Sequence, residues 1–393
     1  MKAYKKAIIS SILVVFACLG LARFAFGMIL PNMQIDLHLN ATQAGFIGSL
    51  NFLGYLLGLF FSSKFYTKFG AQILIKRSLL TQAFSMLMMG LLSNYLLISM
   101  FYLLTGFFGA LANISIMTYV TQIVPKEIRG KTAGLAIIGI GSGIMLSGFS
   151  LPLFENIYNE TSWRVSWISF AFIVLCIAFV TQKGLKHEMH NNITSTNANL
   201  STIKTILDKS FLKVAFLYLI FGITYVVFVT FFVLAAQTKW GVSTEISGSF
   251  WALLGFASLF AGPLFGSIAD KIGSFKALSI IFFIQTLANL LLSFDTPAYF
   301  LWLCAFLFGV STWGVPSIMT VLSGELFGIE KTAKILSLVT IFFASGQIIG
   351  PFGAGLIVDI FGNFSYIFAL SSLLTFIGFF SSLLFASKAL SKN

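Results

Sequence analysis

The chain has 393 residues, of which 58% are hydrophobic, 16% aromatic and only 9% charged, and its net charge is +12. Soluble globular proteins carry about 25% charged residues, so this composition excludes that class. Apolar runs of roughly 17 to 25 residues, the length of a membrane-spanning helix, recur along the whole chain and indicate an all-α, multi-pass membrane protein.

The first apolar segment, residues 7–33, follows three lysines and so shares a pattern with secretory signal peptides. Its apolar run continues to Pro31, which is longer than a signal-peptide core, and many further spans follow it. We therefore interpret it as an uncleaved first helix. Arg23 stands near the middle of that helix.

Apolar segments divide the chain into twelve predicted spans. They cover residues 7–33, 42–63, 73–92, 96–121, 132–154, 163–182, 211–236, 244–268, 276–294, 298–323, 333–358 and 363–387. With the N-terminus inside the cell, 21 of the 24 Lys and Arg residues fall in cytoplasmic segments, and Arg23, Arg164 and Lys239 are the exceptions. The positive-inside rule thus predicts cytoplasmic N- and C-termini in a cell membrane. The basic residues follow the topology, so we expect a lipid-bilayer setting and no nucleic-acid partner.

A polar segment rich in Ser, Thr and Asn, residues 183–210, separates an N-terminal lobe (1–182) from a C-terminal lobe (211–393). His187 and His190 lie in this linker, and we interpret them as solvated residues rather than as a metal site. The three cysteines stand inside apolar runs and form no disulfide or metal spacing. The sequence therefore predicts neither a metal nor a cofactor.

The two lobes carry matching motifs. Gly45 aligns with Gly248 and Gly70 with Gly273 at an offset of 203, "SIMT" recurs at 115–118 and 317–320, and "KTA" at 131–133 and 331–333. Each match is short, but together they keep the same order along the chain. They predict a duplicated six-helix unit, and transporters built from such parallel repeats bind substrate at the repeat interface.

The segment "GSIADKIGSFK" at 266–276 resembles the signature of the major facilitator superfamily (MFS), and "SSKFYTKFGAQ" at 62–72 is a weaker copy with Thr67 in the position of the Asp. The segments "VPKEIRGKTAG" (124–134) and "TSWRVSW" (161–167) are similar to later parts of the same family. This resemblance implies two pseudo-symmetric six-helix bundles closed by a conformational latch. The implied latch residues are Lys68, Gly70, Arg129, Gly266, Asp270, Lys271 and Gly273.

The stretch from Gly20 to Gly58 and "GITYVVFVTFFV" at 222–233 further resemble the YbfB-like bacterial branch of that superfamily. In the superfamily, helices 1, 4, 7 and 10 line a central cavity and helices 2, 5, 8 and 11 flank it. Polar or aromatic residues near the middle of these spans are the candidate substrate contacts. They are Arg23, Asn51, Tyr55, Asn113, Tyr225, Trp313 and Gln347.

Arg23 is the most informative of these candidates. An arginine at the bilayer centre costs about 2.5–3.5 kcal/mol on insertion scales and almost always faces a bundle interior or a wet cavity. A structural role, bonded to carbonyls or to an acid, is the alternative, but every acid near a span lies at its end. These acids are Asp36, Glu155, Glu160, Glu245, Asp295, Glu325 and Asp359. The pattern favours a substrate carboxylate or phosphate as the partner of Arg23, since the planar guanidinium binds either group through two bonds.

The other candidates have competing interpretations. Asn51, Asn113 and Gln347 are equally suited to hydrogen bonds between helices, which polar residues often provide in membranes. Trp313 either stacks on substrate or packs in the bundle, and Tyr225 stands opposite Arg23 in the repeat alignment. The glycine-rich stretches 134–143 and 345–355 predict close helix packing and not phosphate loops, because they lie within apolar spans.

The sequence therefore predicts a non-enzymatic secondary transporter that moves a small, negatively charged organic solute by rocking of its lobes, and that functions as a monomer. An exporter of amphipathic compounds with an aromatic cavity is the alternative within transport, and a transporter-like sensor or scaffold is the alternative outside it. No P-loop is present. Facilitated transport, anion exchange and proton coupling through the substrate or an end-located acid all remain open.

Overall fold

The computed structural model describes residues 4–125, 128–185 and 209–390, and nearly all of them are helical. Before residue 186 the elements are α1 (Lys5–Val15), the π-helix η2 (Phe16–Phe24), α2 (Phe26–Asp36), α3 (Ala41–Leu91), α4 (Tyr95–Ile123), α5 (Arg129–Tyr158), η4 (Asn159–Thr161), α6 (Ser162–Val180) and η5 (Thr181–Lys183). After residue 208 they are α8 (Lys209–Trp240), α9 (Thr244–Ile272), α10 (Ser274–Ser293), α11 (Phe300–Thr312), α12 (Gly314–Phe327), η7 (Ile329–Lys331), α13 (Thr332–Phe361) and α14 (Ser365–Leu390). His187, His190 and most of the predicted linker lie outside the described residues.

Ten helical stretches within the described ranges are long and apolar enough to cross a membrane. Two of them, 41–91 and 132–183, contain 51 and 52 residues, whereas about 20 residues suffice for one crossing. Each leaves helical geometry inside its length, at Gly70 (φ +73°) and at Asn159 (φ +49°). A residue with positive φ interrupts a right-handed helix, so each long stretch consists of two successive helices.

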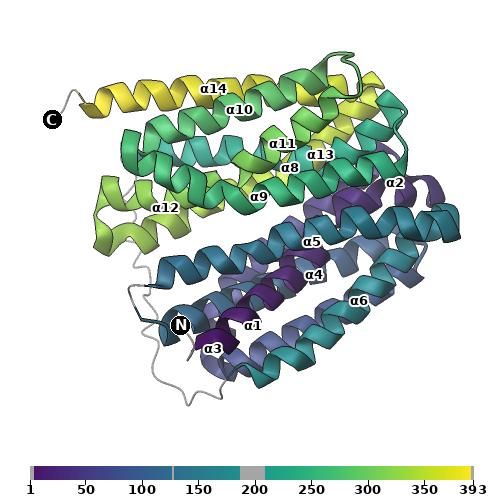
Figure 1. Ribbon diagram of the computed structural model, residues 1–393, viewed down its shortest axis with the longest axis horizontal. Coiled ribbons are helices and arrows are strands. Elements are labelled where there is room, and N and C mark those ends of the chain that lie inside the picture. Colours follow the sequence, from purple (N-terminus) through teal and green to yellow (C-terminus); the bar gives the residue numbers. More distant parts are fainter. Residues whose placement is uncertain (1–3, 126–127, 186–208, 391–393) are drawn as a thin grey trace.

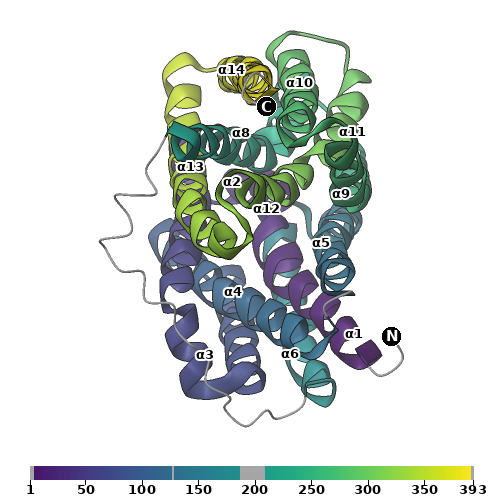
Figure 2. The same cartoon turned by 90° about the vertical axis from the view of Figure 1, so that its left-hand side faces the viewer.

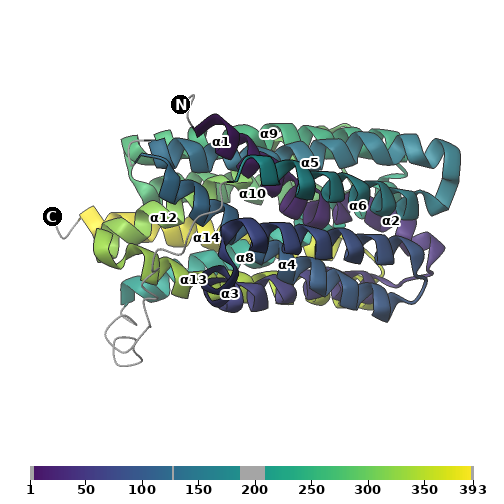
Figure 3. The same ribbon diagram turned by 90° about the horizontal axis from the view of Figure 1, so that it is seen from below.

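The helices form two groups that run nearly parallel to the long axis of the molecule (Figures 1 and 3). We call the helices before residue 186 the first group and those after residue 208 the second group. In Figure 2, α1, α3, α4 and α6 of the first group lie below, and α8 to α14 of the second group lie above. The groups meet where α5 contacts α9 and where α3 contacts α13. We call the end at which α1 begins the α1 end, and the end at which α2 stops the α2 end.

Backbone conformations repeat between the two groups. Three residues of the first group that have positive φ are each matched by a glycine with positive φ exactly one repeat length, 203 positions, further on. The pairs are His38 and Gly241, Gly70 and Gly273, and Asn159 and Gly362. The repeated turns thus have the same spacing as the repeated sequence motifs.

The glycine-rich stretch of α5 packs closely on both sides, as the sequence predicts. A methyl group added at Gly148 would lie 2.6 Å from the carbonyl oxygen of Gly248 on α9, and one at Gly141 would lie 2.6 Å from that of Gly255. On its other face, Gly143 meets the backbone of Gly20 in η2. Only glycine permits helix backbones to approach this closely, so α5 connects the candidate Arg23 helix to the second group.

An ion pair closes the first group at the α2 end. The Arg164 Nη2 atom lies 2.9 Å from the Asp36 Oδ2 atom, and Arg164 Nη1 donates to the Leu92 carbonyl at 2.7 Å. Trp163 Nε1 also donates to Asp36 Oδ2, at 2.9 Å. One guanidinium therefore ties α6 to α2 and to the end of α3, which explains a basic residue outside the predicted cytoplasmic clusters.

Replacing Arg164 by Ala is expected to lower the free energy of unfolding by about 2 kcal/mol, because the Asp36 carboxylate and the backbone carbonyls at the end of α3 lose charge-assisted hydrogen bonds. Thermal melting of the purified protein in detergent measures this change. Lys64→Ala removes an exposed cation and is the matched control. Equal melting temperatures for the two variants would contradict the structural role of Arg164.

Candidate substrate cavity

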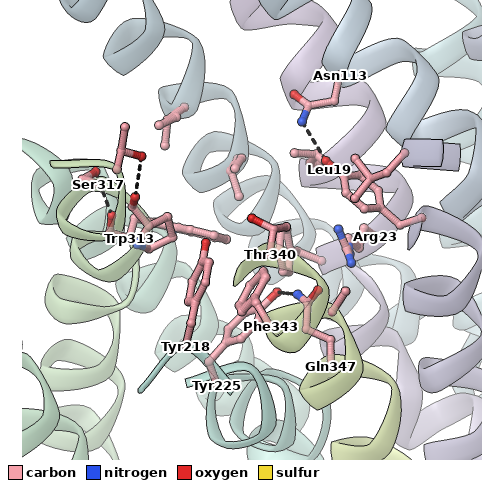
Figure 4. Close-up of a pocket in the computed structure, with 18 residues that line it drawn as sticks. Leu19, Arg23, Asn113, Tyr218, Tyr225, Trp313, Ser317, Thr340, Phe343 and Gln347 are labelled. Carbon is pink, nitrogen blue, oxygen red and sulfur yellow. Dashed lines mark hydrogen bonds between the residues drawn. The ribbon is translucent and has the colours of Figure 1, made fainter. Parts of the chain in front are cut away.

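A cavity of about 390 Å³ lies between the two helix groups (Figure 4). Its size falls within the range of about 300–1,000 Å³ that is typical of small-molecule sites. It is lined by Leu19, Arg23, Phe24, Tyr55, Leu59, Asn113, Ile137, Ile140, Tyr218, Tyr225, Trp313, Pro316, Ser317, Thr320, Thr340, Phe343, Ala344 and Gln347. Arg23 is the one charged residue in this lining.

Arg23 is 8% exposed, and its guanidinium packs on aromatic rings of α3. The Cζ atom lies 4.1 Å from the centroid of the Phe52 ring and 4.4 Å from that of Tyr55. Its Nε and Nη2 atoms are buried, and no group in the described part of the chain accepts a hydrogen bond from them. A buried cation with unused donors strongly favours an anion at this position.

The backbone that carries Arg23 is itself unusual. Residues Phe16–Phe24 form a π-helix, in which the Ala25 N–H donates to the Gly20 carbonyl at 3.2 Å, five residues back. The Tyr102 hydroxyl of α4 donates to the Arg23 carbonyl at 2.8 Å. π-Helical turns are rare and occur frequently at functional sites. Here the wider turn and the bond from Tyr102 orient the segment that presents Arg23.

Each helix group contributes one pair of a tyrosine and an amide to the cavity wall. Asn113 Nδ2 donates to the Tyr55 hydroxyl at 2.9 Å, and Gln347 Nε2 donates to the Tyr225 hydroxyl at 3.0 Å. Since both hydroxyls accept from an amide, their own protons remain available as donors. The two pairs place polar groups on opposite sides of the cavity, near Arg23.

The wall formed by the second helix group is largely aromatic (Figure 4). The Phe343 ring is nearly parallel to that of Tyr218 (centroids 4.4 Å apart, 13°) and to that of Tyr225 (5.8 Å, 16°). The ring centroid of Trp313 lies 6.1 Å from that of Tyr225, and the ring of Phe24, from η2 of the first group, lies 5.4 Å from that of Trp313. These rings form a continuous surface that begins beside Arg23.

Six of the seven predicted contact residues line the cavity, and Asn51 does not. Asn51 is 1% exposed, and its Nδ2 atom donates at 3.0 Å to the Tyr102 carbonyl and at 3.0 Å to the Thr105 hydroxyl. It therefore links α3 to α4, the interhelical role that the sequence left open. Tyr218 and Phe343 were not predicted, although Tyr218 stands seven residues before Tyr225 and hence on the same helix face.

The predicted latch residues cluster at the turns of the α1 end. Gly70 and Gly273 both have positive φ, at +73° and +89°, as a tight turn between helices requires. Arg129 Nε donates to the Val124 carbonyl at 3.4 Å. The ion pairs found within the described ranges, Arg164 with Asp36 and Lys239 with Asp295, do not involve these residues. The latch therefore stays a prediction.

Residues 15–383 match the family model described as "Uncharacterised MFS-type transporter YbfB". The chain is 23% identical over 324 residues to the multi-drug resistance efflux pump PmrA of Streptococcus pneumoniae, covering 79% of this chain and 77% of that protein. It is 24% identical over 375 residues to the hexuronate transporter of Bacillus subtilis, covering 89% of this chain and 87% of that protein.

Solved structures show the same fold. The nucleoside transporter NupG superimposes with a TM-score of 0.79 at 12% identity, covering 98% of this chain and 99% of that one. A bacterial homologue of the human lysosomal transporter Spinster superimposes with a TM-score of 0.79 at 12% identity over 99% of this chain and 98% of that one. The chain is therefore a multi-pass membrane transporter and not an enzyme, and it belongs to the YbfB-like family of MFS transporters.

Proposed function

We propose that this transporter moves a small organic anion by alternating access around the cavity between its two helix groups. The observation that carries the proposal is Arg23, a buried cation with unused donors that is the only charge lining the cavity. A solute carboxylate or phosphate supplies the missing negative charge, and the planar guanidinium binds either group through two parallel bonds.

The acids of the chain support this proposal because several are engaged elsewhere. Asp36 pairs with Arg164, Asp295 lies 3.1 Å from Lys239, and the Glu325 carboxylate accepts a hydrogen bond from the Ser274 hydroxyl. None of them lines the cavity. A purely structural arginine would need a partner of opposite charge or several carbonyl acceptors to offset its desolvation.

The proposed transporter has twelve spans, with both termini in the cytoplasm of a bacterial cell, and functions as a monomer. The breaks at Gly70 and Asn159 support two crossings for each of the long stretches 41–91 and 132–183. The turns repeated at a spacing of 203 support two equivalent lobes, 1–182 and 211–393, joined by the linker 183–210. In this orientation the α1 end faces the cytoplasm.

Contacts at the α2 end support a state that is closed on the outside. Asp359 of α13 accepts hydrogen bonds from the backbone N–H groups of Ala41 (2.9 Å) and Thr42 (2.8 Å) at the start of α3. A carboxylate there satisfies donors that a helix leaves open and complements the helix dipole. By contrast, the cavity-lining residues Ile137 of α5 and Thr320 of α12 lie only about two helical turns from the ends of these helices at the α1 end, so the cavity lies near that end. Rocking of the lobes would break the Asp359 contact and open the cavity to the outside.

A thermal-shift screen of purified protein tests the proposed substrate charge. Benzoate and cyclohexanecarboxylate are expected to raise the melting temperature of the wild type but not that of Arg23→Ala, whereas the hydrophobic cation tetraphenylphosphonium is expected to raise neither. Equal stabilisation of wild type and variant by the anions would refute the anion site.

An exporter of amphipathic compounds is the second candidate function. The aromatic wall around Phe343 favours it, as does the efflux activity named for the pneumococcal relative. In the same screen, stabilisation by the hydrophobic cation alone would support this candidate over the first.

A further inference from the structure

We propose that the solute of this cavity is a monocarboxylate with a flat aromatic body. The inference rests on the proposed function, namely that Arg23 binds an anion, and it adds the number of charges and the shape of the rest of the molecule.

The cavity offers a cation for one negative charge. Arg23 is its sole charged lining residue, and the guanidinium is already held against the rings of Phe52 and Tyr55. These contacts use the faces of the guanidinium. Its N–H groups lie in the guanidinium plane, and two of them suit the two oxygens of one carboxylate. A second carboxylate on the solute would be desolvated in the cavity without a cation to pair with, which is strongly unfavourable. Dicarboxylates are therefore excluded.

The remainder of the solute meets aromatic surface that starts directly beside the charge. The Arg23 Cζ atom lies 5.8 Å from the centroid of the Phe24 ring, which lies 6.5 Å from that of Tyr225. Tyr225 continues into the nearly parallel rings of Phe343 and Tyr218. A carboxylate bound at Arg23 thus directs its substituent along a wall of rings, where a flat aromatic group adopts stacked or edge-to-face geometry.

A set of four matched compounds tests the inference by isothermal titration calorimetry on the full-length protein. Benzoate carries a carboxylate on an aromatic ring, cyclohexanecarboxylate carries it on a saturated ring of the same size, phthalate adds a second carboxylate, and benzyl alcohol lacks the charge. We expect benzoate to bind about fivefold more tightly than cyclohexanecarboxylate, the ratio that one aromatic contact supplies. Phthalate and benzyl alcohol are expected to bind too weakly to measure.

Two variants test the aromatic wall. Phe343→Leu is expected to bring the ratio of the benzoate and cyclohexanecarboxylate affinities close to one. Phe352→Leu changes an exposed aromatic residue on the same helix, outside the cavity, and is expected to keep the wild-type ratio. Tyr218→Leu repeats the test in the event that Phe343→Leu does not fold.

The possible outcomes separate this inference from the proposed function. Equal affinities of the wild type for benzoate and cyclohexanecarboxylate would overturn the aromatic preference and leave the anion site intact. Tighter binding of phthalate than of benzoate would overturn the single charge. Failure of every carboxylate to bind, or binding of benzyl alcohol as tight as that of benzoate, would overturn the proposed function itself.

Discussion

Replacing Arg23 by Gln is expected to weaken the binding of benzoate and of cyclohexanecarboxylate alike, by about 100-fold. The variant loses two charge-assisted hydrogen bonds to the carboxylate, and a combined loss of about 3 kcal/mol corresponds to that factor. Arg23→Lys keeps the charge but not the planar pair of donors, so we expect a loss of about tenfold. Titration calorimetry of the three proteins measures both effects.

The stability of Arg23→Gln distinguishes a binding role from a structural one. Placing the guanidinium at the middle of the membrane costs about 2.5–3.5 kcal/mol of free energy, and its cation–π contacts with Phe52 and Tyr55 offset about 2 kcal/mol of this cost. Removing the charge should therefore leave the melting temperature of the ligand-free protein unchanged or slightly higher. A clear fall in melting temperature, without any change in carboxylate affinity, would identify Arg23 as a structural residue.

Crosslinking the two lobes at the α2 end is expected to abolish transport almost completely. The Thr42 hydroxyl donates to the Asp359 carboxylate across the interface, so cysteines at these two positions lie within reach of a short bis-thiol reagent. Because alternating access requires this contact to open, a covalent bridge should stop turnover, and reduction of the bridge should restore it. Uptake of labelled benzoate into proteoliposomes, before and after reduction, measures the effect.

A matched pair of cysteines controls for chemical modification. Gln237 and Thr244 are hydrogen-bonded at 3.2 Å between α8 and α9 and belong to one lobe, so a bridge there should leave transport unchanged. Cys176 is exposed and is first replaced by Ser, whereas Cys18 and Cys304 are buried. Full transport by a Thr42–Asp359 variant whose bridge is confirmed by mass spectrometry would show that the lobes do not need to separate there.

The sequence predicts much of this fold because membrane helices are specified locally. Apolar length defines each span, and the glycines at 70 and 273 mark turns that need positive φ. The position of Arg23 at the cavity also follows from sequence, since a charge at mid-membrane has few other places to lie. These features depend on the chemistry of single segments and not on how neighbouring helices pack.

The orientation of Asn51 depends on packing and was not predictable in the same way. A methyl group added at Gly106 of α4 would collide with the Asn51 carbonyl, so the backbones of α4 and α3 approach closely at this residue. The Asn51 side chain consequently bonds to α4 instead of reaching the cavity. Spacing along one helix indicates which residues share a face, but it does not indicate which neighbour covers that face.

The π-helix and two residues of the aromatic wall, Tyr218 and Phe343, were missed for a related reason. The wider turn at Arg23 is accompanied by the hydrogen bond from Tyr102, a residue 79 positions away in the sequence. The chain contains 46 phenylalanines, so composition alone does not distinguish Phe343 from the many that face lipid. Only the parallel arrangement of Phe343 with Tyr218 and Tyr225 indicates a binding surface.

Counterflow of labelled benzoate in proteoliposomes tests the central proposal most directly, because it requires both binding at Arg23 and movement across the membrane. Vesicles loaded with unlabelled benzoate and containing the wild-type protein are expected to accumulate label transiently above its equilibrium level. Vesicles with Arg23→Gln are expected to behave as protein-free liposomes do. Equal accumulation by the two proteins, or none by either under conditions in which benzoate binds the wild type, would contradict an Arg23-dependent anion transporter.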